Sequence, residues 1–138
     1  MTRFQQSIED GYVRSMGANK IKAKSLLASS EEAIYSAGKI TIEDKTLKSI
    51  LRELYEGLRQ FCEAIGYLHG YKFLSHEAIT YFLEDILHES TISIKFDRYR
   101  KIRNGINYYG DDVEIETVKD ALKEIPLLIS KLKQHVKI

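Results

Sequence analysis

The sequence predicts an all-α protein: an antiparallel bundle of about five helices in one domain that spans residues 1–138. Three observations favour this fold class. The chain has one proline and eight glycines, too few chain breakers for a β fold with many turns. Hydrophobic residues make up 43% of the 138 residues, enough for one buried core. Several long segments repeat apolar residues at steps of three and four, the period of a helix buried on one side.

Composition narrows the classes of function. The formal net charge is +1, so any attraction to nucleic acid must be local to one surface. The single cysteine, Cys62, excludes an internal disulfide network and fits a reducing cytoplasm. No segment approaches the roughly 20 apolar residues that cross a bilayer, and the N-terminal residues have no signal-peptide pattern. We therefore expect a soluble, cytoplasmic protein that does not bind membranes, and no sequence pattern calls for a cofactor.

The first two segments differ in regularity. Residues 1–17 have a helical pattern that Gly11 and Gly17 interrupt, which predicts an irregular lead-in. Residues 19–37 then repeat small and apolar side chains at helical spacing, and Gly38 is placed to end that helix as a C-terminal cap.

The second helix has the strongest pattern. Thr41, with Asp44 three residues later, resembles a capping box just before it. An apolar stripe follows through residues 47–68 and includes Cys62, which predicts a buried, unreactive thiol. Gly70 is placed to close this helix.

Three further helices complete the predicted bundle. Residues 75–87 begin with a serine suited to an N-cap and continue with an amphipathic pattern. The fragment TISI at 91–94 is β-like but too short to make a sheet. A fourth helix covers residues 96–110 and stops at a glycine. The last runs over residues 113–136, where Pro126 removes one backbone hydrogen bond and predicts a kink.

The fourth helix, FDRYRKIRNGINYYG, is unusually basic. Residues 95–103 contain five cations and one anion, so the local charge is +4. At 100° per residue, a sector of about 80° holds the predicted core side chains Tyr99, Ile102, Ile106 and Tyr109. A polar sector roughly opposite holds Arg100, Arg103, Asn104 and Asn107.

This polar sector is a candidate binding surface. Asparagine is a poor helix former, yet Asn104 and Asn107 both lie inside the helix. Gly105 costs about 1 kcal/mol relative to alanine, which favours a close approach by another backbone or a ligand. Arginine forks onto phosphate oxygens, asparagine contacts bases or ribose, and the neighbouring tyrosines Tyr108 and Tyr109 can stack on unpaired bases. A solvated cationic face or a protein–protein interface would use the same residue types.

The run LRELYEGLRQFCEAIGYLHGYKFLSHEAI, followed by a helix bearing YRKIRNGINYYG, resembles the HEPN domain family. The resemblance covers roughly residues 20–136 and rests mainly on helix order and the Arg-Asn pair. It implies a small helical bundle, often dimeric, of the kind found in toxin–antitoxin, CRISPR-associated and nucleotidyltransferase-linked systems. Active members of the family are metal-independent ribonucleases, and two copies meet across a dimer interface to form one cleft.

The family motif is an arginine, usually a polar residue next, and a histidine after four to six intervening residues. Arg103 and Asn104 match its start. The positions for the histidine are occupied by Tyr108 and Tyr109, and tyrosine, with an ordinary pKa of about 10, is a poor base near neutral pH. The tyrosine that a partner nucleotidyltransferase adenylylates in some relatives corresponds to Gly110.

Three hypotheses follow from the surface and the resemblance. The first is a HEPN-like homodimer with weak or lost ribonuclease activity. It binds RNA or a nucleotide through five residues of the fourth helix: Arg100, Arg103, Asn104, Asn107 and Tyr109. The second is a non-catalytic interaction module that partners a nucleotidyltransferase. The third is an active metal-independent endoribonuclease with Arg103, Asn104 and Tyr108 as catalytic residues.

The remaining polar residues predict no other site. His69 and His76 bracket the turn between the second and third helices but lack the spacing and further ligands of a metal site, so we predict none. His76 is expected to form a hydrogen bond near the helix start. The glutamates of the second helix are expected to face solvent or to pair with Arg52 and Arg59, and one of them is a candidate to orient Arg103.

Overall fold

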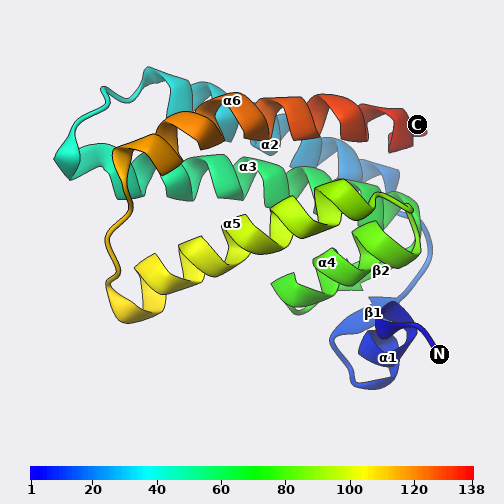
Figure 1. Ribbon diagram of the computed structural model, residues 1–138. Helices are drawn as coiled ribbons and strands as arrows, with labels where there is room; N and C mark the ends of the chain where they lie inside the picture. The colour runs from blue at the N-terminus through cyan, green and yellow to red at the C-terminus, as the bar shows by residue number, and fades with distance from the viewer.

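The computed structural model describes all of residues 1–138 and confirms the predicted all-α bundle (Figure 1). In chain order the elements are α1 (Arg3–Glu9), β1 (Val13–Ser15), α2 (Lys20–Lys39), the 3-10 turn η1 (Asp44–Thr46), α3 (Leu47–Leu68), β2 (Tyr71–Phe73), α4 (His76–Asp85), α5 (Ser90–Tyr109), α6 (Ile115–Leu132) and the 3-10 turn η2 (Lys133–His135). The two strands pair only with each other. None of these helices has both the length and the apolar character needed to cross a membrane.

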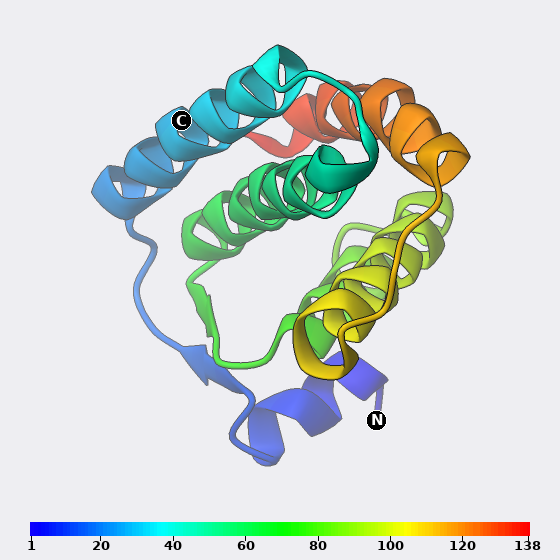
Figure 2. The same ribbon diagram turned by 90° about the vertical axis from the view of Figure 1, so that its left-hand side faces the viewer.

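Helix α3 lies at the centre of the bundle, with α2 and α6 on one side and α4 and α5 on the other (Figure 2). It lies close to α2 at Gly57, whose carbonyl accepts a hydrogen bond of 2.6 Å from the buried hydroxyl of Ser30. A methyl group at Gly57 would lie 2.6 Å from Cδ1 of Ile34, so only glycine allows this approach without repacking. The apolar stripe predicted for residues 47–68 is therefore confirmed as the main core surface.

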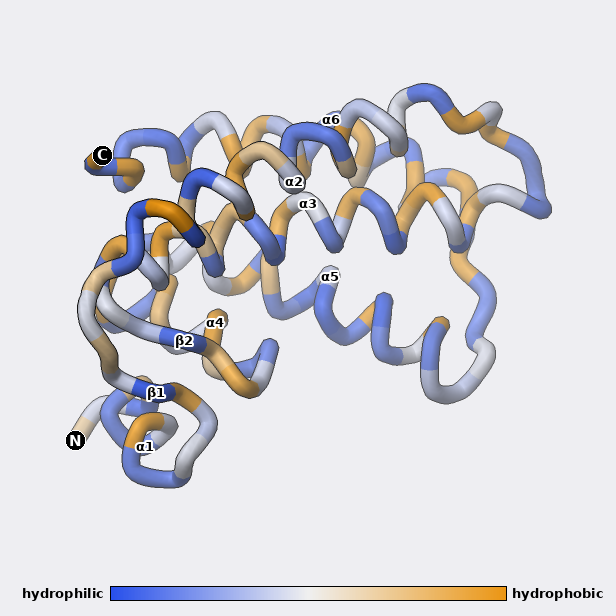
Figure 3. The backbone as a smooth tube through the Cα atoms, turned by 180° about the vertical axis from the view of Figure 1, so that it is seen from behind, coloured by the Kyte–Doolittle hydropathy of each residue, from blue (hydrophilic) through white to orange (hydrophobic).

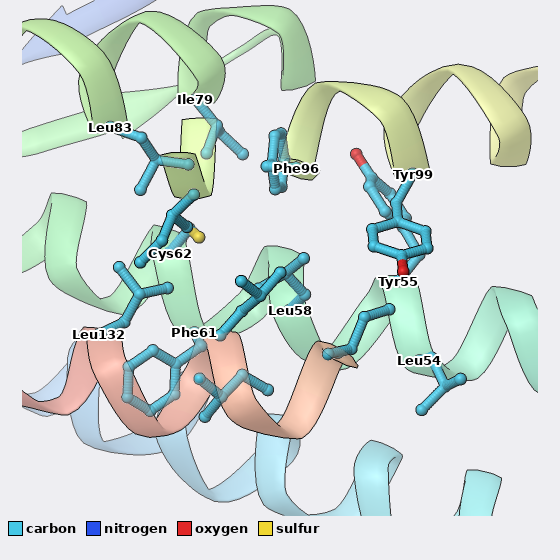
Figure 4. Packing of buried hydrophobic residues seen from close by; sticks show 14 of the residues in the cluster. Leu54, Tyr55, Leu58, Phe61, Cys62, Ile79, Leu83, Phe96, Tyr99 and Leu132 are labelled. Atoms are coloured by element: carbon cyan, nitrogen blue, oxygen red, sulfur yellow. The ribbon is translucent and has the colours of Figure 1, made fainter. Parts of the chain in front are cut away.

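Figure 4 shows part of the core, with labelled side chains from α3, α4, α5 and α6. Residues of α3 meet Ile79 and Leu83 of α4, Phe96 and Tyr99 of α5, and Leu132 of α6. Cys62 is fully buried among them, and burial raises the pKa of its thiol well above the ordinary value. The prediction of a buried cysteine is confirmed, and a thiol that stays protonated is unreactive.

A second group of aromatic rings joins α1, β2 and α4. Phe82 of α4 is fully buried, and its ring centroid lies 5.6 Å from Phe4 and 5.3 Å from Phe73. The rings of Tyr71 and His69 lie 6.1 and 5.5 Å from it. These separations are those of edge-on and tilted aromatic pairs, so this cluster holds the N-terminal segment onto the bundle.

The predicted irregular lead-in at residues 1–17 is wrong, because this segment forms α1 and β1. Thr2 and Gln5 make a capping box at the start of α1, and Phe4 is only 1% exposed. Strand β1 then pairs antiparallel with β2, with Val13 opposite Phe73. Three-residue strands are too short to show an alternating pattern, so they could not be predicted from the sequence.

Several boundaries also differ from prediction. Helix α2 continues through Gly38 to Lys39, and the reciprocal capping bonds are made by Glu43 and Thr46 rather than by Thr41 and Asp44. The β-like fragment at 91–94 is helical, because α5 begins at Ser90 and buries Ile92. Burial on one face overrides the β propensity of this fragment.

Other predicted boundaries are confirmed. Ser75 occupies the N-cap position of α4. Gly110 ends α5 in the left-handed conformation with φ of 67°, and Gly70 follows α3 with φ of 83°. Pro126 lies inside α6, although that helix is shorter than the predicted 113–136.

Candidate functional site

Helix α5 consists mostly of hydrophilic residues (Figure 3). Its core face is as predicted at Tyr99 and Ile106, which are buried, and at Ile102, which is half-buried. Tyr109 is instead 81% exposed, so its predicted place in the core is wrong. The end of α5 lies away from α3 (Figure 1), and the exposure of Tyr109 shows that no core surface covers the helix there.

The polar side of α5 and the start of α4 enclose an open depression of about 480 Å³. Helix α5 contributes Arg100, Arg103, Asn104 and Tyr108. The segment that leads into α4 contributes Leu74, Ser75, His76 and Glu77. Four predicted site residues thus line one concavity: Arg100, Arg103, Asn104 and Tyr108.

Arg100 is already paired within the protein. Its Nε and one terminal nitrogen donate to the carboxylate of Asp97 at 2.9 and 2.7 Å, and a carboxylate oxygen of Glu77 lies 3.9 Å away. Lys101 also contacts Asp97 at 3.0 Å. Although burial opposes ionisation of Asp97, hydrogen bonds from Lys101 and Arg100 hold the pKa of that carboxyl below its ordinary value. Asp97 is already counted in the local charge of +4, and the only further acidic partners of this segment are Glu124, 2.9 Å from Lys95, and Glu77.

Arg103 is the cation in the depression that lacks an acidic partner. Its guanidinium donates only to the amide oxygen of Asn104, at 3.3 Å, and lies over the ring of Tyr55 with 5.6 Å to the centroid. The side chain is half-buried. The aromatic ring and the amide fix its direction while leaving the remaining donors of the guanidinium free.

The glutamates of α3 do not orient Arg103. Glu56 and Glu63 both form ion pairs with Arg59, as the sequence predicted for that arginine. Arg52 pairs differently from prediction: its Nε donates to the amide oxygen of Asn107 at 2.8 Å. Asn107 is exposed and lies outside the lining of the depression, so its amide acts between α3 and α5.

His76 also lines this depression, and sequence reasoning did not include it in the candidate site. Its Nδ1 lies 3.2 Å from the phenol oxygen of Tyr55, which confirms a hydrogen bond near the start of α4, and Nε2 has no hydrogen-bond partner in the protein. Burial first, and then the charges of Arg59 and Arg103, lower the pKa of His76 to about 4. The imidazole is therefore neutral near pH 7. Its only sequence signal was its position beside the Ser75 N-cap.

The start of α4 adds backbone donors to the same concavity. Ser75 is the N-cap residue, but its side chain accepts no hydrogen bond from the first turn. The amides at the start of α4 therefore have no side-chain acceptor, and the N-terminal end of a helix carries partial positive charge. These amides increase the positive potential that Arg103 provides.

The two tyrosines at the end of α5 differ in position. Tyr108 lines the depression and is 70% exposed, whereas Tyr109 lies outside it. A phenol that faces an open concavity can stack on a base or donate a hydrogen bond. Of the two, only Tyr108 is placed beside Arg103.

Gly105 allows a close approach, but by a side chain of the following loop. A methyl group there would lie 2.5 Å from a carboxylate oxygen of Asp111. The backbone amide of Asp111 also donates to the carbonyl of Gly105 at 3.1 Å. The glycine thus lets the loop fold back over α5, and the predicted approach by a backbone or ligand is replaced by this contact.

We expect Gly105→Ala to raise the free energy of unfolding by about 0.5–1 kcal/mol, because alanine has the higher helix propensity. The exposed Asp111 side chain can swing away from the new methyl group. Urea denaturation followed by circular dichroism measures the change.

The matched control is Gly57→Ala, where the methyl group would meet Ile34 and the backbone oxygen of Ser30. We expect that variant to lose about 1–3 kcal/mol through overpacking. A loss of stability in Gly105→Ala as large as in the control would contradict a movable Asp111.

Another depression, of about 620 Å³, lies between α2, α3 and α6. Its lining is largely apolar, with Leu27, Ile34, Phe61 and Ile129 among its residues. Glu31 and Lys133 are the charged residues in its lining, and it has no histidine or arginine. The depression beside Arg103 is the stronger candidate for a functional site, because its lining combines an unpaired cation, an amide and an imidazole.

His69 and His76, which were considered as metal ligands from the sequence, do not form a metal site. His69 is exposed and packs against Phe82, and His76 bonds to Tyr55. No group of three or more histidine, cysteine, aspartate or glutamate side chains is placed to hold a metal ion.

No family model, curated protein or solved structure matches the chain.

Proposed function

We propose that the protein is a HEPN-like RNA- or nucleotide-binding protein that holds a phosphate group beside Arg103. One observation carries this proposal: Arg103 is half-buried in an open concavity, and no carboxylate neutralises it. An arginine that is directed by neighbours but has free donors is suited to bidentate contact with phosphate oxygens.

The surroundings of Arg103 fit the rest of a nucleotide. Asn104 offers an amide for a base edge or a ribose hydroxyl, and the exposed ring of Tyr108 offers a stacking surface. The uncapped first turn of α4 adds amide donors for an anion. Bases are reached only when unpaired, so single-stranded RNA fits this arrangement better than a duplex.

The wider biological setting is proposed from the family resemblance. We infer a cytoplasmic homodimer in which two such depressions face one groove, in a system of the toxin–antitoxin kind. The second candidate function is a non-catalytic module that binds a nucleotidyltransferase through the same surface. The exposed aromatic rings of Tyr108 and Tyr109 favour such an interface, because tyrosine is enriched where proteins meet.

Arg103→Ala is expected to weaken binding of fluorescently labelled single-stranded RNA at least about tenfold, since a hydrogen-bonded charge contributes roughly 1.5–3 kcal/mol. Fluorescence anisotropy measures the dissociation constant. Repeating the titration at several salt concentrations should give a smaller salt dependence for the variant, because one phosphate contact is lost.

The control is Arg98→Ala, which removes an exposed arginine of the same helix that lies over Tyr99 and outside the depression. We expect at most a twofold effect from it. Equal RNA affinity of wild type and Arg103→Ala would refute the proposed groove. Binding of a nucleotidyltransferase without RNA affinity would favour the second candidate.

A further inference from the structure

A second depression lies on the other side of the start of α4. It has a volume of about 460 Å³ and is enclosed by α1, the loop that follows α1 and the first turns of α4. Ser75 and Glu77 line both this depression and the one beside Arg103, so the two adjoin across the first turn of α4. A single-stranded RNA whose phosphate contacts Arg103 would therefore place a neighbouring nucleotide at the edge of the second depression.

The charges of the second depression do not suit a phosphate. Its lining contains one cation, Arg3, and two carboxylates, Asp10 and Glu77, and this excess of negative charge repels an anion. Glu77 is already engaged, because it accepts a hydrogen bond from the phenol of Tyr81 and lies 3.9 Å from a guanidinium nitrogen of Arg100. The carboxylate of Asp10 is therefore the acidic group left for a ligand.

Arg3 and Asp10 both lack an oppositely charged partner. Arg3 forms no ion pair, and its guanidinium carbon lies 5.7 Å from the ring centroid of Tyr81. Asp10 forms no ion pair either, and one of its carboxylate oxygens accepts a hydrogen bond of 2.9 Å from the side-chain amide of Gln6. The two residues are seven positions apart, which is about 10 Å along a helix. An arginine and a carboxylate thus face one concavity without neutralising each other.

Tyr12 adds an aromatic surface to the same concavity. Its backbone is held on both sides, because its amide donates to the carbonyl of Ser7 at 2.9 Å and its carbonyl accepts from the amide of Leu74 at 2.8 Å. Its ring is 54% exposed. A fixed tyrosine with an open ring face is suited to stack on an unpaired base.

We propose that the second depression binds a guanine of the RNA strand that Arg103 holds. The inference rests on the proposed RNA binding and adds a base preference to it. Guanine has the acceptors O6 and N7 on one edge and the adjacent donors N1–H and N2–H₂ beside them. Arg3 donates to O6 and N7, the carboxylate of Asp10 accepts from N1–H and N2–H₂, and the base stacks on Tyr12. None of the other three bases offers two adjacent donors, so each makes fewer bonds with this pair of residues.

The test compares the binding of fluorescently labelled oligouridine with that of the same RNA carrying one central guanine. We expect wild type to bind the guanine-containing RNA at least about fivefold more tightly. Inosine at the same position, which lacks the 2-amino donor, should bind less tightly than guanine. Arg103→Ala should weaken the binding of both RNAs by a similar factor, because phosphate contacts carry no base information.

Asp10→Asn should abolish the guanine preference, because its amide presents a donor to the donors of the base. Its affinity for oligouridine should stay the same or rise up to about twofold, since a charge that repels phosphate is removed. The matched control is Glu9→Gln, which neutralises the neighbouring exposed carboxylate of α1 outside the depression and should keep the full preference.

Tyr12→Ala should weaken the binding of the guanine-containing RNA at least about fivefold through the lost stacking. Its control is Tyr35→Ala, which removes a tyrosine of α2 that is 67% exposed and lies outside both depressions. We expect at most a twofold effect from the control.

Equal affinity of wild type for both RNAs, or a guanine preference that survives Asp10→Asn, would overturn this inference and leave the proposed RNA binding intact. Wild type without a base preference that binds a labelled arginine-rich peptide, with the binding lost in Asp10→Asn, would assign the depression to a basic protein partner and overturn the base site. Failure of wild type to bind either RNA would instead overturn the proposed function.

Discussion

Replacing Phe82 with alanine is expected to lower the free energy of unfolding by about 3–5 kcal/mol, the range for deleting a fully buried phenylalanine. Phe82 is 0% exposed and packs against rings from α1 and β2 and against His69 at the end of α3. The small protein cannot fill the resulting cavity without moving Phe4 and Phe73. Urea denaturation measures the loss, and amide hydrogen exchange should also rise most in β1 and β2.

The matched control is Tyr109→Ala, which removes an aromatic ring that is 81% exposed at the end of α5. Surface changes of this kind alter stability by less than about 0.5 kcal/mol. A loss below about 1 kcal/mol in Phe82→Ala would mean that the aromatic cluster does not hold the N-terminal segment in place.

The second large effect is expected for Gly70→Ala, at about 2–4 kcal/mol of lost stability. Gly70 has φ of 83°, a conformation that costs other residues about 1–2 kcal/mol. A methyl group would in addition overlap the backbone carbonyl oxygen of Met16, beside the hydrogen bond of 2.8 Å from the Met16 amide to the Gly70 oxygen. The chain next to β1 and β2 would have to separate to make room.

Gly11→Ala separates the two contributions. Gly11 has φ of 82°, nearly the same as Gly70, but a methyl group there would meet no atom within 4 Å. We expect it to lose only the conformational part, about 1–2 kcal/mol, in the same denaturation assay. Equal losses in the two variants would contradict the close approach at Gly70.

The long helices could be predicted because their signals are local. The stripe of α3 spans residues 47–68, and a repeat of that length is read from neighbouring residues alone. The end of α5 at Gly110 and the N-cap at Ser75 were predicted for the same reason. The fragment at 91–94 was interpreted as β-like because its β-branched residues dominate a short window, whereas burial of Ile92 inside α5 decides its conformation.

In the candidate site, too, the residues that lie close together in the sequence could be predicted and the contacts between distant residues could not. Arg103, Asn104 and Tyr108 lie on one helix, so helical geometry placed them together. The pairing of Arg100 with Asp97 and of Arg52 with Asn107 could not be separated from other combinations, because a flexible side chain has several partners within reach. Tyr109 was assigned to the core because a helical wheel assumes that a helix is covered along its whole length.

Periodicity and caps in the chain therefore specified the long helices, the buried thiol and the arginine surface of α5, since each depends on residues a few positions apart. The pairing of β1 with β2, the aromatic cluster around Phe82 and the meeting of His76 with Arg103 depend on how α4 packs against α5 and α1. Such contacts join residues far apart in the chain through their shared packing on α3, and no local pattern records them.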